Sequence, residues 1–138
     1  MSQPHEHESL ADLYLATIVL TKIEGEWILA HHAAARLGPI HVLTAWNPGS
    51  DRPSRAANDV ANEALRQLLV AESCSLVPAL GSDPNSEHVE ESWSVSGLTD
   101  RRAREIGALF GQWAVFRISP TEQAVLGCFG DWARSRPI

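Results

Sequence analysis

The segment LTAWNPGSDRPS, residues 43–54, joins a strand to a helix and decides where polar side chains collect in the predicted fold. Its first residues are apolar and continue a buried strand that starts at Ile40. The Asn-Pro-Gly turn at 47–49 ends this strand, because proline has no amide hydrogen and glycine permits a sharp turn. Ser54 has the residue type of a helix N-cap. The segment therefore predicts an amide side chain and a helix N-terminus at the end of a central strand.

Two amphipathic helices are predicted after this turn. Residues 54–72 carry apolar side chains three and four positions apart, which predicts a helix with one buried stripe. Thr99 has the side chain of an N-cap and precedes a second helix. The residues of this helix predicted to face inward are Ala103, Ile106, Leu109 and Phe110.

The other apolar or alternating segments are predicted strands, and the Glu24-Gly25 pair predicts a hairpin between the first two. These segments are 14–23, 26–32, 40–46, 73–80, 90–98, 113–119 and 123–129. A competing interpretation makes residues 9–18 a short helix that Ser9 caps. The helix and the strand are compatible if the helix ends before Thr17.

From Ile40 to Ser119 the predicted order is strand, helix, strand, strand, helix, strand, which is the order of a ferredoxin-like βαββαβ core. We therefore predict an α+β fold. It is a two-layer sandwich with a mainly antiparallel sheet and two helices on one face, extended by an N-terminal hairpin and a C-terminal strand. The strands at 40–46 and 91–97 are expected to be antiparallel neighbours in the middle of the sheet.

Length and composition indicate one folded domain. The chain has 138 residues, 44% of them hydrophobic, which is enough for a single core. We place this domain at residues 10–132, between a flexible tail at 1–9 and a second tail at 133–138. Cys74 and Cys128 lack the paired spacing of zinc or redox sites and are predicted to be free thiols.

The charge balance and the absence of targeting signals limit the partners and the location. A formal net charge of -6 disfavours binding to nucleic acid. No segment approaches the roughly 18 continuous apolar residues of a membrane helix. The N-terminal residues lack the basic and apolar regions of a signal peptide. We therefore expect a cytoplasmic protein with no membrane partner.

The predicted topology brings polar side chains from three strand ends to one rim of the sheet, together with the start of the first helix. Glu91 is the candidate catalytic base, and the candidate ligand-binding residues are Asn47, Ser54, Asn58, Glu90 and Gln112. A partly buried carboxyl group has a raised pKa and suits proton transfer or metal binding. The alternative is a structural network, in which these amides satisfy backbone groups and Ser54 only caps the helix.

The leading functional interpretation is a small-ligand-binding domain that acts on an anionic or phosphorylated metabolite, because a helix N-terminus favours anions. The alternative is a protein-interaction or regulatory module without catalytic activity, which uses exposed tryptophans such as Trp27 and Trp132. His31, His32 and His41 are expected to have surface or loop roles rather than to bind a metal. The sequence contains no phosphate-binding glycine motif or nucleophile elbow, so it assigns no reaction and no cofactor.

Four short motifs give the chain a family resemblance. They are TAWNPGS at 44–50, the Ser54/Asn58 pair, EESWSV at 90–95 and FGQWAVF at 110–116. Together, in this order, they resemble the bacterial family called domain of unknown function 3293, over roughly residues 14–129. The resemblance implies a small single-domain bacterial protein whose biochemical activity has not been assigned.

The resemblance also implies which polar positions recur in the family. They correspond here to Asn47, Ser54, Asn58, Glu91 and Gln112. The chain departs from the family pattern at Ala57, where members tend to have a glutamate that completes a capping box. It departs again at His88-Val89, where the family often has a tryptophan. Together these departures weaken a ligand site, or else they only relax the helix cap at Ala57 and a packing contact at His88-Val89.

Overall fold

The computed structural model describes residues 4–50, 52–85 and 88–138. Over these residues the helices are α1 (Pro4–Leu15), α2 (Ala30–Leu37), α3 (Arg55–Ala71) and α4 (Asp100–Leu109), with a short 3-10 helix η1 (Pro48–Ser50). The strands are β1 (Ile18–Ile23), β2 (Glu26–Leu29), β3 (Ile40–Leu43), β4 (Ser75–Ser82), β5 (Val89–Ser96), β6 (Ala114–Ile118), β7 (Glu122–Gly127) and β8 (Ala133–Pro137). None of the described helices is long and apolar enough to span a membrane.

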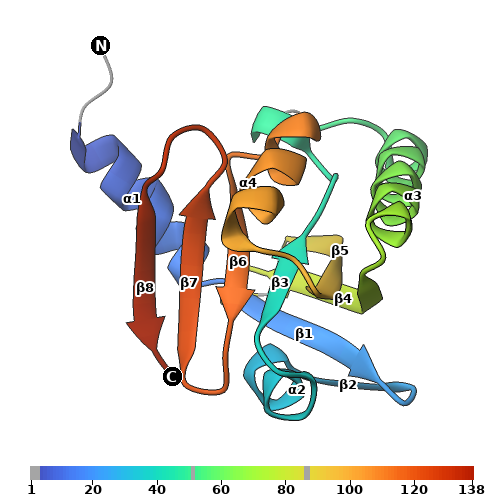
Figure 1. The fold of residues 1–138 in the computed structure, drawn as a ribbon. Helices are drawn as coiled ribbons and strands as arrows, with labels where there is room; N and C mark the ends of the chain where they lie inside the picture. Colours follow the sequence, from blue (N-terminus) through green and yellow to red (C-terminus); the bar gives the residue numbers. More distant parts are fainter. Residues whose placement is uncertain (1–3, 51, 86–87) are drawn as a thin grey trace.

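The described strands form one curled sheet with the order β2-β1-β4-β5-β3-β6-β7-β8. All neighbouring strands in it run antiparallel. In Figure 1, β6, β7 and β8 stand upright, whereas β1 and β4 lie across the view behind β3. The sheet is therefore a half-barrel with a concave inner face and a convex outer face.

The fold class predicted from the sequence, a two-layer ferredoxin-like sandwich with two helices on one face, is wrong. The structure instead has a half-barrel with helices on both faces. The expected pairing of the two central strands is present, since β3 runs antiparallel to β5 with Val42 opposite Ser94. The helix proposed to end before Thr17 is present as α1, but the predicted fold class counted neither α1 nor α2. It also did not allow for the twist that accumulates over eight strands until an open sheet curls.

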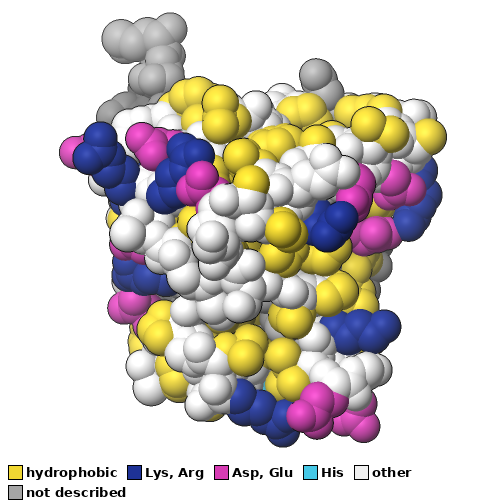
Figure 2. All heavy atoms as spheres, turned by 45° about the vertical axis from the view of Figure 1, so that its right-hand side comes forward, with side chains coloured by type: hydrophobic (Ala, Val, Ile, Leu, Met, Phe, Trp, Pro, Cys, Tyr) yellow, Lys and Arg dark blue, Asp and Glu magenta, His cyan; other side chains and the backbone are white. Residues whose placement is uncertain are grey.

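The outer face is covered by α3 and α4 and contains the larger core of the molecule. Its buried side chains come from both helices and from four strands, and they include Leu43, Leu65, Leu69, Val95, Ile106, Val115 and Leu126. On the solvent side of α3, acidic and basic side chains lie next to each other, as in Glu63 and Arg66. Figure 2 shows this mixture of charges on the side where α3 comes forward.

The inner face is covered only in part, by α1 and α2. Ala30 and Ala34 of α2 pack against apolar residues of β1, β3, β4 and β6. At the other end, Leu15 of α1 packs against β6 and β7, and its carbonyl accepts a hydrogen bond of 2.7 Å from Arg136 Nε. Between the two helices the sheet carries small residues, among them Gly81, Ser92 and Ala114. Small side chains inside a curled sheet leave space there.

Local signals predicted α3 and α4 and their N-caps correctly. The Oγ atom of Ser54 accepts a hydrogen bond of 3.1 Å from the amide of Ala57, and Thr99 Oγ1 accepts one of 3.1 Å from Arg102. Leu109 was predicted to face inward but is 69% exposed. It lies roughly 120° around the helix from the buried stripe that contains Ala103, because each residue advances about 100°.

The ends of the chain differ from the prediction. Helix α1 begins at Pro4, so residues 4–9 are helical where a flexible tail was expected, and residues 1–3 lie outside the described residues. Strand β8 occupies most of the predicted tail at 133–138. Both ends are held by tertiary contacts, including an ion pair of 3.2 Å between Arg134 and Asp12. Such long-range contacts leave no pattern in the local sequence.

Candidate functional site

The curl of the sheet and helix α1 enclose a cavity of about 330 Å³ on the inner face. One part of its wall is apolar and is formed by Leu13, Tyr14, Val19, Val42, Ala114 and Phe116. The polar part includes Thr44, Asn47, Arg52, His88, Glu90, Ser92 and Gln112. The lining residues come from α1, from the strands β1, β3, β4, β5 and β6, and from the loops beside them. The cavity is therefore built by tertiary structure and not by one contiguous motif.

Strand β5 supplies the polar floor of the cavity. Successive side chains of a strand point to opposite faces of the sheet. Glu90 and Ser92 consequently face the inner side and line the cavity. Trp93 and Val95 face the outer side and pack in the core under α3 and α4.

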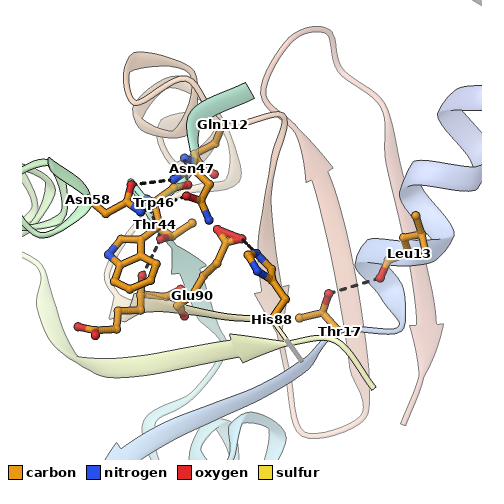
Figure 3. A network of polar contacts seen from close by, with 11 residues as sticks. Leu13, Thr17, Thr44, Trp46, Asn47, Asn58, His88, Glu90 and Gln112 are labelled. Carbon is orange, nitrogen blue, oxygen red and sulfur yellow. Dashed lines mark hydrogen bonds and ion pairs between the residues drawn. The ribbon is translucent and has the colours of Figure 1, made fainter. Parts of the chain in front are cut away.

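Glu90 is a half-buried acidic side chain that lines the cavity. Burial raises the pKa of its carboxyl group, against the opposing effects of His88 and of the Arg52 charge. His88 Nε2 lies 3.3 Å from Glu90 Oε2. Figure 3 shows the Glu90 carboxyl group between His88 and Asn47. A carboxyl group of this kind exchanges a proton closer to neutral pH than an exposed glutamate does.

The apolar wall of the cavity is partly aromatic. The ring centroid of Tyr14 lies 5.2 Å from that of Trp113 and 5.9 Å from that of Phe116. Burial, followed by the charge of Glu90, raises the pKa of Tyr14 to about 12. Tyr14 is therefore a neutral phenol near pH 7, and it lines the cavity.

The turn after β3 places Asn47 at the edge of the cavity. Asn47 has a φ of 49° and Gly49 a φ of 56°, both in the left-handed region that asparagine and glycine tolerate best. The amide of Gly49 donates a hydrogen bond of 2.9 Å to the carbonyl of Gly111. This bond ties the turn to the loop that precedes β6, which brings Gln112 beside it.

Two buried amides of α3 hold the same turn from the outer side. Asn62 Oδ1 accepts a hydrogen bond of 3.1 Å from the amide of Ala45. Asn58 accepts one of 3.1 Å from the amide of Asn47 and donates one of 3.0 Å to Asn47 Oδ1. Asn58 and Asn62 therefore satisfy backbone groups that no strand or helix partner satisfies at this turn.

Gln112 binds two backbone carbonyls and also lines the cavity. Its Nε2 atom donates to the carbonyl of Trp46 at 3.0 Å and to that of Phe110 at 3.4 Å. The side chain is buried and also lines the cavity. Because its nitrogen is used by the backbone, Gln112 presents mainly its amide oxygen to a ligand.

Glu91, the predicted catalytic base, lies on the outer side of β5 and does not line the cavity. Its carboxylate pairs with Arg55 of α3, and both side chains are largely exposed. The guanidinium of Arg55 also lies over the Trp46 ring, 5.3 Å from its centroid. The sheet therefore separates Glu91 from the residues that surround Glu90.

Of the residues predicted to form a site, the structure brings Asn47, Glu90 and Gln112 together at the cavity. Ser54 caps α3, Asn58 supports the turn and Glu91 lies on the other face. The prediction did not include several other cavity residues, namely Tyr14, Thr44, Arg52, His88, Ser92 and Phe116. Because side chains alternate between the two faces of a strand, placing Glu90 on the inner face also places His88 and Ser92 there. No local sequence pattern indicates that Tyr14 lies at the cavity.

The remaining candidates have other surroundings. His31 and His32 lie in α2 rather than on a strand, and the buried ring of His41 is 2.8 Å from Asp100 Oδ1. Trp27 is half-exposed on strand β2, whereas Trp132 packs against Trp113 with centroids 4.5 Å apart. Among residues 4–50, 52–85 and 88–138, no group of three or more His, Cys, Asp or Glu side chains is arranged to hold a metal ion.

Comparison with known proteins gives one match. Residues 43–115, more than half of the chain, match a family model described as "Protein of unknown function (DUF3293)". This match confirms the family resemblance and contains the turn, α3, β5 and Gln112. No curated protein and no solved structure matches the chain.

Proposed function

The chain belongs to the DUF3293 family of proteins of unknown function, and we propose that it binds a small molecule in the inner cavity. The observation that carries this proposal is the half-buried carboxyl group of Glu90 inside a cavity of about 330 Å³. Small-molecule sites are typically concave, mostly apolar and lined by a few polar groups that fix the orientation of the ligand. The inner cavity combines these features.

In this proposal the inner-face residues take the roles that the sequence suggested for the rim. Glu90 replaces Glu91 as the group that binds and exchanges a proton with the ligand. Asn47 and Gln112 orient the ligand, and Tyr14 supports its apolar part. All four of these residues line the cavity on the concave side, which supports this assignment. The Glu91 carboxylate instead forms an ion pair with Arg55. Anionic fragments in the titration represent the anionic or phosphorylated metabolite that was expected from the sequence.

A cytoplasmic location is part of the same proposal. Cys74 and Cys128 are both free thiols in the structure. Free thiols are typical of proteins from reducing compartments, where disulfides rarely persist.

The test is a nuclear magnetic resonance titration of the ¹⁵N-labelled full chain with a set of cationic, neutral and anionic single-ring fragments. The side-chain amides of Asn47 and Gln112 report on the cavity, and the buried amide of Asn62 on the outer face serves as an internal reference. We expect at least one fragment to shift the first two resonances in a saturable way and to leave the third unchanged.

A matched pair of variants locates the binding. Ser92→Phe places a ring inside the cavity, whereas Val60→Phe adds the same ring at a position that is 72% exposed on α3. We expect the first variant to abolish the fragment shifts and the second to retain them. Shifts that persist in the filled variant, or a complete absence of saturable shifts in the wild-type chain, would contradict a ligand site in the cavity.

A further inference from the structure

We infer that the ligand of the inner cavity is a small organic cation, an ammonium or amidinium compound whose N–H groups donate to Glu90 and whose apolar body packs against Tyr14 and Phe116. This inference rests on the proposed function, because it specifies the ligand of the same cavity. It is drawn from the side chains that line the two ends of the cavity.

The apolar end has an aromatic wall that suits the apolar body of such a cation. Tyr14 and Phe116 both line the cavity, with their ring centroids 5.9 Å apart. The face of an aromatic ring attracts a cation within about 6 Å of its centroid, and this attraction grows as water is removed. The same rings also bury apolar carbon. An amine with a short apolar body satisfies both properties.

The polar end is rich in hydrogen-bond acceptors. Glu90 offers two carboxyl oxygens, and Gln112 presents its amide oxygen because its nitrogen donates to two backbone carbonyls. The Thr44 hydroxyl donates to the carbonyl of Glu91 at 2.6 Å and accepts from the amide of Trp46 at 3.1 Å, so it has only one further acceptor position for a ligand. A ligand that carries several N–H donors therefore finds partners here.

The position of the charges argues against an anionic ligand. The titratable groups that line the cavity are Tyr14, Arg52, Asp83, His88 and Glu90. The fixed cation among them, Arg52, is exposed, whereas Glu90 is half-buried. An anion at the floor would approach a carboxylate in a region of reduced dielectric, where like charges repel more strongly than in water. An ammonium group at that position instead restores the charge balance of a carboxylate that burial disfavours.

The test compares benzylamine, benzyl alcohol and benzoate, which share one ring and differ in charge. Affinities are measured from the Asn47 and Gln112 amide shifts of the full wild-type chain. We expect benzylamine to bind at least about tenfold more tightly than benzyl alcohol, and benzoate to bind most weakly, since a hydrogen bond to a charged partner is worth about that factor. Benzylamine binding should also strengthen as the pH rises through the raised pKa of Glu90, because the carboxyl group then loses its proton.

Two variants on one strand provide the matched control. Glu90→Gln keeps the shape of the side chain and removes its charge, so the preference for benzylamine over benzyl alcohol should fall by about tenfold. Glu91→Gln makes the same change on the outer face and should leave all three affinities unchanged. Preferential binding of benzoate would overturn the cation assignment while leaving the cavity as a site. Equal loss in both variants, or no binding by any of the three compounds, would also overturn it.

Discussion

Glu90 and Glu91 are adjacent on β5, yet they lie on opposite faces of the sheet. Glu90 faces the inner cavity, where burial raises the pKa of its carboxyl group. Glu91 faces α3 and forms an exposed ion pair with Arg55. The comparison shows that one step along a strand moves a carboxylate from a partly desolvated cavity to a solvated charge pair.

A second carboxylate on the outer side extends the comparison. Asp100, at the start of α4, contacts the buried ring of His41 and the guanidinium of Arg117. Desolvation raises the pKa of Asp100, but its contacts with His41 and Arg117 outweigh that effect and lower the pKa overall. Its ionised form therefore stabilises the fold above the ordinary aspartate pKa, and this contribution is lost as the pH falls through the lowered value.

The two faces therefore differ in what their polar groups contribute. On the outer face the acids are paired with basic groups and the apolar side chains fill a continuous core, which favours stability. On the inner face a carboxyl group is desolvated beside open space, which costs stability and suits ligand binding. Features that are unfavourable for folding are common at functional sites.

The largest effect is expected from the packing of the outer face. Leu69→Ala removes a fully buried side chain of α3 and should lower the free energy of unfolding by about 2 to 5 kcal/mol. Leu109→Ala makes the same change on α4 at a position that is 69% exposed, and should cost less than about 0.5 kcal/mol. Urea denaturation measures both. Similar losses for the two variants would show that the outer core is not the main source of stability.

A smaller effect is expected at the turn that joins the two faces. Asn58→Ala removes the partner of the Asn47 amide and of Asn47 Oδ1, and should cost about 1 to 3 kcal/mol. Asp59→Ala, which changes an exposed residue on the same helix, is the control for helix propensity. If Asn58→Ala leaves stability unchanged in urea denaturation, the Asn58 amide is not structural and its assignment as a ligand-binding residue regains support.

The smallest effect is expected from the acids of β5, and it depends on pH. Because the pKa of Glu90 is raised in the folded state, wild-type stability should fall as the pH rises from the ordinary glutamate pKa to the raised one. Glu90→Gln should remove this fall. At neutral pH this variant should be as stable as the wild type or more stable by less than about 1 kcal/mol.

Glu91→Gln, which breaks an exposed ion pair, should instead lower stability by less than about 1 kcal/mol. Thermal melts across the pH range measure both changes, and a loss of stability in Glu90→Gln would contradict the desolvation of Glu90.

The sequence predicted those parts of the site that depend on neighbours along the chain. The turn at 47–49, the Ser54 cap and helix α3 follow from local residue preferences, and they are present. The antiparallel pairing of β3 and β5 was also predicted, and it brings Asn47, Glu90 and Gln112 to one region. The sequence did not tell which of Glu90 and Glu91 lines the cavity, because an alternating strand defines two faces without saying which one is concave.

The sequence by itself determined which segments form the turn, the capped helices and the alternating strands, since backbone sterics and periodicity act over a few residues. Only the tertiary structure decided that the sheet curls, that α1 packs against its inner face and that Tyr14 meets Glu90 across a cavity. Curvature depends on twist summed over all eight strands, and the position of α1 depends on contacts with β7 and β8 at the other end of the chain. The curvature and the position of α1 both depend on contacts between residues that are far apart in the sequence, and no local segment encodes such contacts.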